Sequence, residues 1–197
     1  MYAMAEYFCL TEDMNVLDVG GDDMANWNFL KDIPHLTFVN IAKRPINLPN
    51  CVNYIQADAR YLPFDENAFD LVFSNSVIEH VGNFEDQKRM AEEIRRVGRS
   101  YYVQTPNFWF PVEPHLITPF IHWLPKQLRK ILMKNFTIWG WITRPSRDYC
   151  ENFVNMTRLL KMSEMRTLFP NGEFQPEKLF GMNKSIIVVH REGKKEF

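Results

Sequence analysis

The sequence lacks most of the features that mark secreted, metal-clustered or membrane-spanning proteins. Only three of the 197 residues are cysteines, and Cys9, Cys51 and Cys150 are far apart, in no spacing typical of a zinc site. No stretch reaches the roughly 18 uncharged apolar residues of a membrane span. The first ten residues contain an acid and no basic segment. These absences predict a cytoplasmic protein with reduced thiols.

A strong charge of either sign is also missing. The formal net charge is −1 at pH 7, which argues against binding of nucleic acid over the whole surface. There is no internal repeat or low-complexity tract, and 46% of the residues are hydrophobic, enough to bury a substantial core. We therefore expect a single domain over residues 1–197 and no nucleic-acid partner.

Residues 54–81 are the most informative stretch. They place one short strand before Asp58 and a second over residues 69–73, with a proline-containing loop between them. The second strand runs into a polar segment, residues 74–76, and then into Glu79 and His80. Parallel α/β sheets present polar groups at the carboxyl ends of their strands, and this is the edge where such folds bind ligands.

At these residues the sequence resembles the class I S-adenosylmethionine-dependent methyltransferases, in the small-molecule, type 11-like branch. The pattern D-A-x-x-L-P-F-x-(D/E)-x-x-F-D-x-V, continued by (I/L)-E-H-(V/I), is matched at nearly every fixed position from Asp58 to Val81. So many positions at fixed spacing are far more specific than a lone glycine motif. The resemblance implies a doubly wound, Rossmann-like α/β domain whose mostly parallel sheet is closed by an antiparallel hairpin. It also implies S-adenosylmethionine as cofactor and methyl transfer to an oxygen or nitrogen of a small-molecule, glycan or lipid-linked acceptor.

The resemblance further implies which residues bind the cofactor. The first glycine turn begins at Gly20, Asp58 stands where an acid receives the adenine amine, and Asn40 stands where an acid normally binds the ribose hydroxyls. Asp22 occupies a position where a small residue is expected, so Asp22 and Asn40 both depart from the pattern. The implied cofactor-binding set is Asp18, Gly20, Gly21, Asp22, Asn40, Ile41, Asp58, Ala59, Ser74, Asn75, Ser76 and His80.

Purely structural roles are open for the same residues. Asp22 and Asp23 would cap a helix over residues 24–31, Asn40 would end a strand, and Asp58 would cap the turn that follows it. The departures at Asp22 and Asn40 leave a second class of function open, a binding or scaffold protein that keeps the fold without catalysis. RNA modification is a weaker third hypothesis, because the chain has no extra basic domain and no recognisable RNA module.

The catalytic candidates follow the fourth and fifth predicted strands. The motif T-P-N at residues 105–107 leads to Glu113 and His115, and His80 follows the fourth strand. His115 ranks first as a general base because imidazole titrates near neutral pH, with Glu113 and His80 as the other candidates. A loop histidine bound by backbone groups is the alternative. Some ubiquinone-pathway O-methyltransferases hold a divalent cation at E-x-x-E-H, but Ser76 replaces the first acid here, so no metal is predicted.

Residues 107–150 are predicted to form an aromatic and basic insertion that acts as a lid. Four of the five tryptophans lie there. One interpretation is a lid that packs its aromatic side chains on the core and leaves its cations in solvent. The other is a lid that covers the acceptor pocket and also contacts an anionic membrane or a lipid-linked acceptor. Residues 116–147 contain no acid and six basic residues, Lys126, Arg129, Lys130, Lys134, Arg144 and Arg147.

Hydrophobic periodicity predicts the remaining elements. An amphipathic helix is expected over residues 83–97 and a strand over 100–105. A second long helix is expected over 155–169, and closing strands over 174–180 and 185–190.

Overall fold

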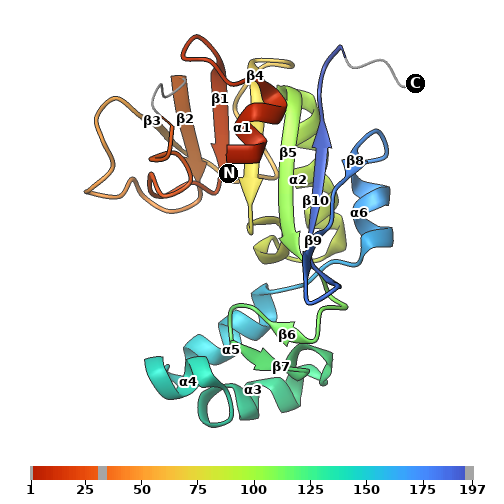
Figure 1. The fold of residues 1–197 in the computed structure, drawn as a ribbon. Helices are drawn as coiled ribbons and strands as arrows, with labels where there is room; N and C mark the ends of the chain where they lie inside the picture. The colour runs from red at the N-terminus through yellow and green to blue at the C-terminus, as the bar shows by residue number, and fades with distance from the viewer. Residues whose placement is uncertain (1, 31–34, 194–197) are drawn as a thin grey trace.

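The computed structural model describes residues 2–30 and 35–193, and its centre is one twisted sheet (Figure 1). The order is β3-β2-β1-β4-β5-β10-β8, and β9 also pairs with β10. The first five strands are all parallel, whereas β10 is antiparallel to β5, β8 and β9. The strands are β1 Asn15–Val19, β2 His35–Asn40, β3 Asn53–Gln56, β4 Phe69–Asn75, β5 Gly98–Pro106, β8 Glu173–Phe174, β9 Glu177–Leu179 and β10 Met182–His190.

Helices cover both faces of this sheet. On one face α1 (Tyr2–Phe8) packs into a buried cluster around Trp27 and Phe38. On the other, α2 (Phe84–Val97) and α6 (Met162–Leu168) enclose a second cluster. Asn83 caps α2 with its side chain, as the sequence predicts for a helix that begins there. The expected α/β fold, with a mostly parallel sheet and antiparallel closing strands, is confirmed.

The described parts of the first two crossovers, residues 20–30 and 41–52, contain no long helix. The helix predicted over residues 24–31 is wrong within the described part, because residues 25–29 form turns and neither residue 24 nor residue 30 is helical; residue 31 lies outside the described residues. Trp27 is fully buried, and its indole N–H donates to Asp18 in β1. This hydrogen bond fixes the middle of the segment to the sheet. In the second crossover the Arg44 guanidinium donates to the carbonyls of Leu48, Pro49 and Val52. A side chain thus provides these carbonyls with the hydrogen-bond donors that backbone amides would provide in a helix.

The helix predicted over residues 155–169 is also wrong, because the chain is extended between Met156 and α6. There the Leu160 carbonyl accepts from the Phe108 amide, and the Arg158 amide donates to the Glu79 carbonyl. These tertiary hydrogen bonds occupy backbone groups that a continuous helix would need. The apolar periodicity was therefore real, but it belongs to two short helices separated by an extended link.

The insertion lies beyond the carboxyl ends of the parallel strands (Figure 1). Its two ends meet, since Asn107 forms a parallel bridge with Leu160. Cys150, the predicted end of the insertion, lies inside a helix that packs on another helix of the insertion, and the bounds 107–150 stay a prediction. The elements of the insertion are β6 Val112–Glu113, β7 Thr118–Pro119, the 3-10 helix η2 Ile121–Trp123, α3 Lys126–Asn135, α4 Ile138–Thr143 and α5 Arg147–Met156.

The insertion has a small core of its own, formed by Leu116, Ile121, Met133, Cys150 and Val154. Within residues 2–30 and 35–193, none of the helices is both long enough and apolar enough to cross a membrane. The cytoplasmic location stays a prediction.

Candidate active site

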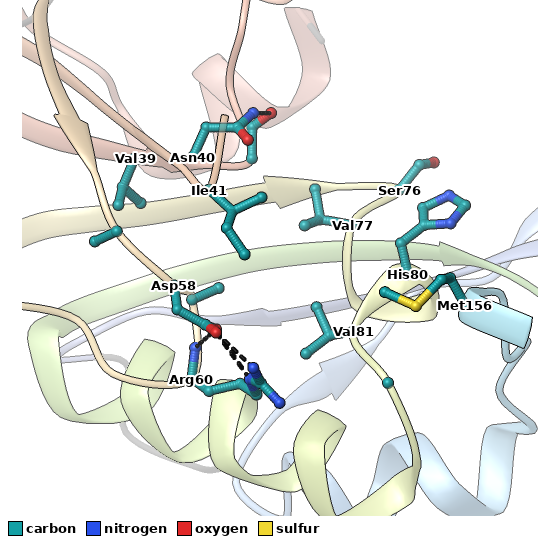
Figure 2. Close-up of a pocket in the computed structure, with 14 residues that line it drawn as sticks. Val39, Asn40, Ile41, Asp58, Arg60, Ser76, Val77, His80, Val81 and Met156 are labelled. Carbon is teal, nitrogen blue, oxygen red and sulfur yellow. Dashed lines mark hydrogen bonds and ion pairs between the residues drawn. The ribbon is translucent and has the colours of Figure 1, made fainter. Parts of the chain in front are cut away.

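A pocket of about 350 Å³ opens at the carboxyl ends of four parallel strands, within the size range of small-molecule sites. Figure 2 shows Asp58 and Arg60 at one end of the pocket and His80 beside Met156 at the other. The wall contributed by β4 continues into the 3-10 helix η1 (Ile78–His80). The lining residues are Gly20, Val39, Asn40, Ile41, Ala57, Asp58, Ala59, Arg60, Ser76, Val77, His80, Val81, Gly82 and Met156.

Gly20 shapes the floor of the pocket directly after β1. Its φ angle is +90°, and a Cβ placed there would lie 2.3 Å from a methyl carbon of Val77. Any other residue would therefore be strained and would collide with the opposite wall. Glycine is therefore required at this point of the pocket floor.

Asn40, at the end of β2, is turned toward the glycine turn. Its side-chain N–H₂ donates to the carbonyls of Gly20 at 3.0 Å and Gly21 at 3.4 Å, while its oxygen accepts from the Ala42 amide at 3.0 Å. Because an amide N–H only donates and a carbonyl only accepts, these partners determine which atom is nitrogen. Asn40 therefore lines the pocket and also stabilises the turn, through a donor that a carboxylate does not have.

Asp58 follows β3 and forms a short-range ion pair with Arg60. Its carboxylate accepts from the Arg60 backbone amide at 2.9 Å and from the guanidinium at 2.6 Å. Arg60 also donates to Asp86 in the first turn of α2 at 2.8 Å. The hydrogen bonds from Arg60 lower the pKa of Asp58, although its burial opposes this. The structural capping role is thus present, and it occupies much of the acceptor capacity that an adenine amine would need.

Five of the predicted cofactor residues do not line the pocket. Asp18 is buried and accepts from Trp27 at 2.7 Å, and a Cβ on Gly21 would lie 2.8 Å from the Asp18 carboxyl carbon. Burial raises the pKa of Asp18 to about 7. The residues outside the lining are Asp18, Gly21, Asp22, Ser74 and Asn75. Their role in cofactor binding stays a prediction, as does the role of the residues that do line the pocket.

The three predicted catalytic residues come together where the pocket meets the insertion. The Nε2 atoms of His80 and His115 lie 3.2 Å apart, and His115 Nδ1 lies 2.7 Å from a carboxylate oxygen of Glu113. The second oxygen of Glu113 accepts from the Leu116 amide at 2.6 Å, so the short β6–β7 hairpin holds His115 in place. The alternative of a loop histidine bound only by backbone does not describe this residue.

Glu79 completes the same cluster although it is fully buried. Thr105, near the end of β5, donates to its Oε2 at 2.9 Å. Its Oε1 has no hydrogen-bond partner among the described residues and lies 3.8 Å from His115 Nε2 and 4.0 Å from His80 Nε2. Phe153 of α5 packs against both imidazole rings.

Burial sets the protonation of this cluster. It raises the pKa of Glu79 to about 7 and lowers the pKa of His80 to about 4, the latter with help from the charge of His115. Burial also opposes a charge on His115, but the hydrogen bond to Glu113 and the charges of Glu113 and Glu79 outweigh it and raise its pKa. His115 is therefore the more basic imidazole of the pair.

Comparisons with known proteins agree with this architecture. Residues 34–100 match the family model of a methyltransferase domain. A segment of 54 residues is 39% identical to part of an uncharacterised Mycobacterium tuberculosis protein. This segment makes up 27% of the present chain and 18% of that protein. A Methanosarcina mazei S-adenosylmethionine-dependent methyltransferase has a TM-score of 0.60 at 16% identity, with 98% of each chain covered. A Burkholderia thailandensis 1,6-didemethyltoxoflavin N1-methyltransferase, solved with S-adenosylhomocysteine, has a TM-score of 0.59 at 11% identity, covering 98% of this chain and 76% of its own.

The family model thus covers about a third of the chain, and the solved structures share its fold; both agree with the class I, type 11-like methyltransferase that the resemblance implied. The cofactor of this family is S-adenosylmethionine. The residues present fit an adenosyl ligand in three respects: the glycine cradle at Gly20, the apolar walls from Ile41 and Val77, and the carboxylate of Asp58 at one end. The segment that matches the Mycobacterium tuberculosis protein spans less than a fifth of that protein's length.

Sequence reasoning missed half of the residues that line the pocket. Arg60 could have been found, because an aspartate two residues before an arginine favours a local capping turn and ion pair. Met156 could not, because it arrives from the far end of the insertion. The missed residues are Val39, Ala57, Arg60, Val77, Val81, Gly82 and Met156.

We expect Asp18→Asn to change the pH dependence of stability. The unfolded chain releases the Asp18 proton near pH 4 and the folded chain near pH 7, so the contribution of Asp18 to stability is fully present below pH 4 and is lost as the pH rises to about 7. Each pKa unit corresponds to about 1.4 kcal/mol, so the loss amounts to several kcal/mol at most. Asparagine keeps an acceptor for Trp27 and carries no charge. Urea denaturation at pH 5 and pH 8 should show a gain over the wild type at both pH values, and the gain should be clearly larger at pH 8.

The matched control is Asp18→Ala, which also removes the hydrogen bond to Trp27 and should be less stable than Asp18→Asn at both pH values. An identical pH dependence for Asp18→Asn and the wild type would show that the carboxyl group ionises freely in the folded chain.

We expect Asn40→Asp to weaken the glycine turn and not to tighten cofactor binding. A carboxylate would face the Gly20 carbonyl in place of a donor, at a cost of about 1 kcal/mol or more. Urea denaturation should show this loss, and calorimetric titration should show no gain in affinity. Asn40→Ala, which removes the bonds without adding repulsion, separates the two effects. Tighter binding by Asn40→Asp would mean that the side chain rotates to the ribose.

Proposed function

We propose that this chain transfers a methyl group from S-adenosylmethionine to an oxygen or nitrogen of an acceptor that binds between the pocket and the insertion. The observation that carries this proposal is the convergence of Gly20, Asn40 and Asp58 on one pocket. They come from the ends of three successive parallel strands, at the edge where this fold binds ligands.

The residues of the chain have separable tasks in this proposal. Gly20 gives the ligand close access to the backbone, Asp58 accepts from the adenine end, and Ile41, Val77 and Val81 exclude water from the walls. When bound, S-adenosylmethionine supplies a methyl group on a positively charged sulfur. The protein contributes mainly by holding the two reactants in line, which requires little side-chain chemistry.

An acceptor that arrives protonated needs a site for its proton. His80 lies at the end of the pocket opposite Asp58, and the Glu113–His115 pair stands directly behind it. We assign proton uptake to this imidazole pair, with His115 as the more basic member and Glu113 as the group that orients it. An acceptor would approach beneath the insertion, past Phe153.

One observation favours the alternative function, a binding or scaffold protein without catalysis. Arg60 fills much of the acceptor capacity of Asp58, and Asn40 is engaged by the glycine turn. Both adenosyl contacts of this chain would then be weaker than in a family member with free acids. Cofactor binding is the measurement that separates the two functions.

We expect the purified chain to bind S-adenosylmethionine and S-adenosylhomocysteine in calorimetric titrations. Asp58→Ala should weaken binding about 10- to 100-fold, because a hydrogen bond to a charged group contributes about 1.5 to 3 kcal/mol. Asp86→Asn, which removes the other partner of Arg60 and leaves Asp58 in place, is the matched control. Absence of heat and of a thermal shift at millimolar cofactor would favour the scaffold function.

The exposed surface of the insertion supports a lipid-linked acceptor as the finer assignment. Ile131, Phe136, Trp141 and Ile142 are each more than 60% exposed. Lys134 and Arg144 share a surface hollow with Trp141. None of the six basic residues between 116 and 147 forms an ion pair with any residue that the structure describes. Apolar side chains beside unpaired cations suit the interface of an anionic bilayer.

We expect the chain to sediment with anionic vesicles at low salt and much less at high salt or with neutral vesicles. The double variant Lys130→Ala/Lys134→Ala should bind about tenfold or more weakly, since each cation contributes about 1 kcal/mol near an anionic surface. Ile142→Ser should also weaken binding, whereas Ile46→Ser, an exposed isoleucine in the second crossover, should not. Negligible binding to both kinds of vesicle would leave the insertion as a lid alone.

A further inference from the structure

We propose that Glu79, His80 and His115 form a binding site for a divalent transition-metal cation, with Zn²⁺ as the reference ion. Two imidazole nitrogens and one carboxylate oxygen meet at this point, all from residues 2–30 and 35–193 that the structure describes. Neutral imidazole and carboxylate are the ligands that zinc and its neighbours take in proteins, whereas magnesium and calcium prefer oxygen ligands alone.

The separations of the three atoms suit one ion. His80 Nε2 and His115 Nε2 are 3.2 Å apart, and Glu79 Oε1 lies 4.0 Å and 3.8 Å from them. A point equidistant from three atoms so placed lies about 2.1 Å from each, the length of zinc bonds to imidazole nitrogen and carboxylate oxygen. These separations suit an ion in the plane of the three atoms, and a tetrahedral ion would need Glu79 Oε1 to lie closer to the two imidazoles.

The positions of the protons on the two imidazole rings explain why this point attracts a cation. His115 Nδ1 faces the Glu113 carboxylate, which accepts, so Nδ1 carries the proton and Nε2 of the neutral ring presents a lone pair. His80 Nδ1 lies 3.3 Å from the Thr157 hydroxyl, which can accept its proton and leave Nε2 with a lone pair as well. A third acceptor, Glu79 Oε1, faces the same point without a hydrogen-bond partner. Three acceptors around one point repel one another unless a proton or a cation lies between them.

The groups behind the ligands hold them as outer partners do in zinc sites. Glu113 orients His115, Thr157 contacts His80, and Thr105 donates to the second oxygen of Glu79. The predicted absence of a metal rested on Ser76, which replaces an acid that precedes Glu79 in sequence. The structure offers a different third ligand, His115, which the β6–β7 hairpin brings from 35 residues further along the chain.

Three protein ligands would leave at least one coordination position open. The site adjoins the pocket through His80, so the open position would be available to an acceptor hydroxyl, whose pKa a bound cation lowers. Metal binding by these residues does not rest on methyl transfer. With an ion bound, the two Nε2 atoms would act as ligands and would no longer take up a proton; the acceptor hydroxyl, its pKa lowered by the cation, would release its proton to solvent.

The test is titration of the metal-stripped chain with Zn²⁺ by calorimetry and with Co²⁺ by visible absorption. Both are performed in a Cys9→Ser/Cys51→Ser background, because these two thiols are exposed and could bind either ion. We expect one Zn²⁺ per chain, Co²⁺ bands of a nitrogen- and oxygen-ligated ion, and a higher melting temperature in Zn²⁺ than in chelator. None of these readouts requires a methyl acceptor or the cofactor.

The variants assign the ion to this cluster. His115→Ala and Glu79→Gln should each weaken Zn²⁺ binding by more than about 100-fold, and Glu113→Gln, which loosens an outer partner, by about 10- to 100-fold. His190→Gln, a histidine outside the cluster, should bind like the parent. Far-ultraviolet circular dichroism in chelator verifies that each variant folds. No stoichiometric uptake by the parent chain, or equal uptake by the parent, His115→Ala and Glu79→Gln, would overturn the proposal.

Discussion

The candidate site depends on one buried amide, that of Gln87 in α2. Its side-chain nitrogen donates to the carbonyls of Ile78 and Arg158 at 2.9 Å each, and its oxygen accepts from the Arg158 guanidinium at 2.8 Å. Gln87 itself is wholly buried, and its bond to Ile78 is shielded from water, whereas the two bonds to Arg158 are partly buried. One side chain thus joins the turn that carries Glu79 and His80 to the segment that returns from the insertion, and it sets how the insertion meets the sheet.

The second constraint is the burial of acids close to the ligand-binding edge. Asp18 and Glu79 are both nearly inaccessible to solvent, and each has a pKa raised to about 7 by burial. Among the described residues, Asp18 has no cationic side chain at ion-pair distance, and Glu79 has only the imidazoles of His80 and His115. Such groups reduce stability at neutral pH, and they are characteristic of positions where ligands bind. Asp18 has a structural partner in Trp27, whereas Glu79 keeps one oxygen free and directed at two imidazoles.

The reduced crossovers give the pocket its shape. Residues 20–30 and 41–52 contain no long helix; instead Asn40 stabilises the turn at Gly20, and Arg44 stabilises the second crossover. Side-chain hydrogen bonds therefore replace helix dipoles and helix packing on this part of the molecule. Asn40, which replaces the expected acid, supplies an N–H donor to the carbonyls of Gly20 and Gly21, and a carboxylate has no such donor.

The sequence by itself determined the sheet and its polar edge, because alternating strands, glycine turns and the pattern from Asp58 to Val81 are local signals with fixed spacing. It also placed Glu113 and His115 near the functional edge, since T-P-N ends a strand there. Only the tertiary structure decided that His115 meets Glu79 and His80, because the β6–β7 hairpin must fold back over the sheet. It also decided that the helix predicted over residues 155–169 is interrupted, since hydrogen bonds to distant backbone groups outweigh the local helical pattern.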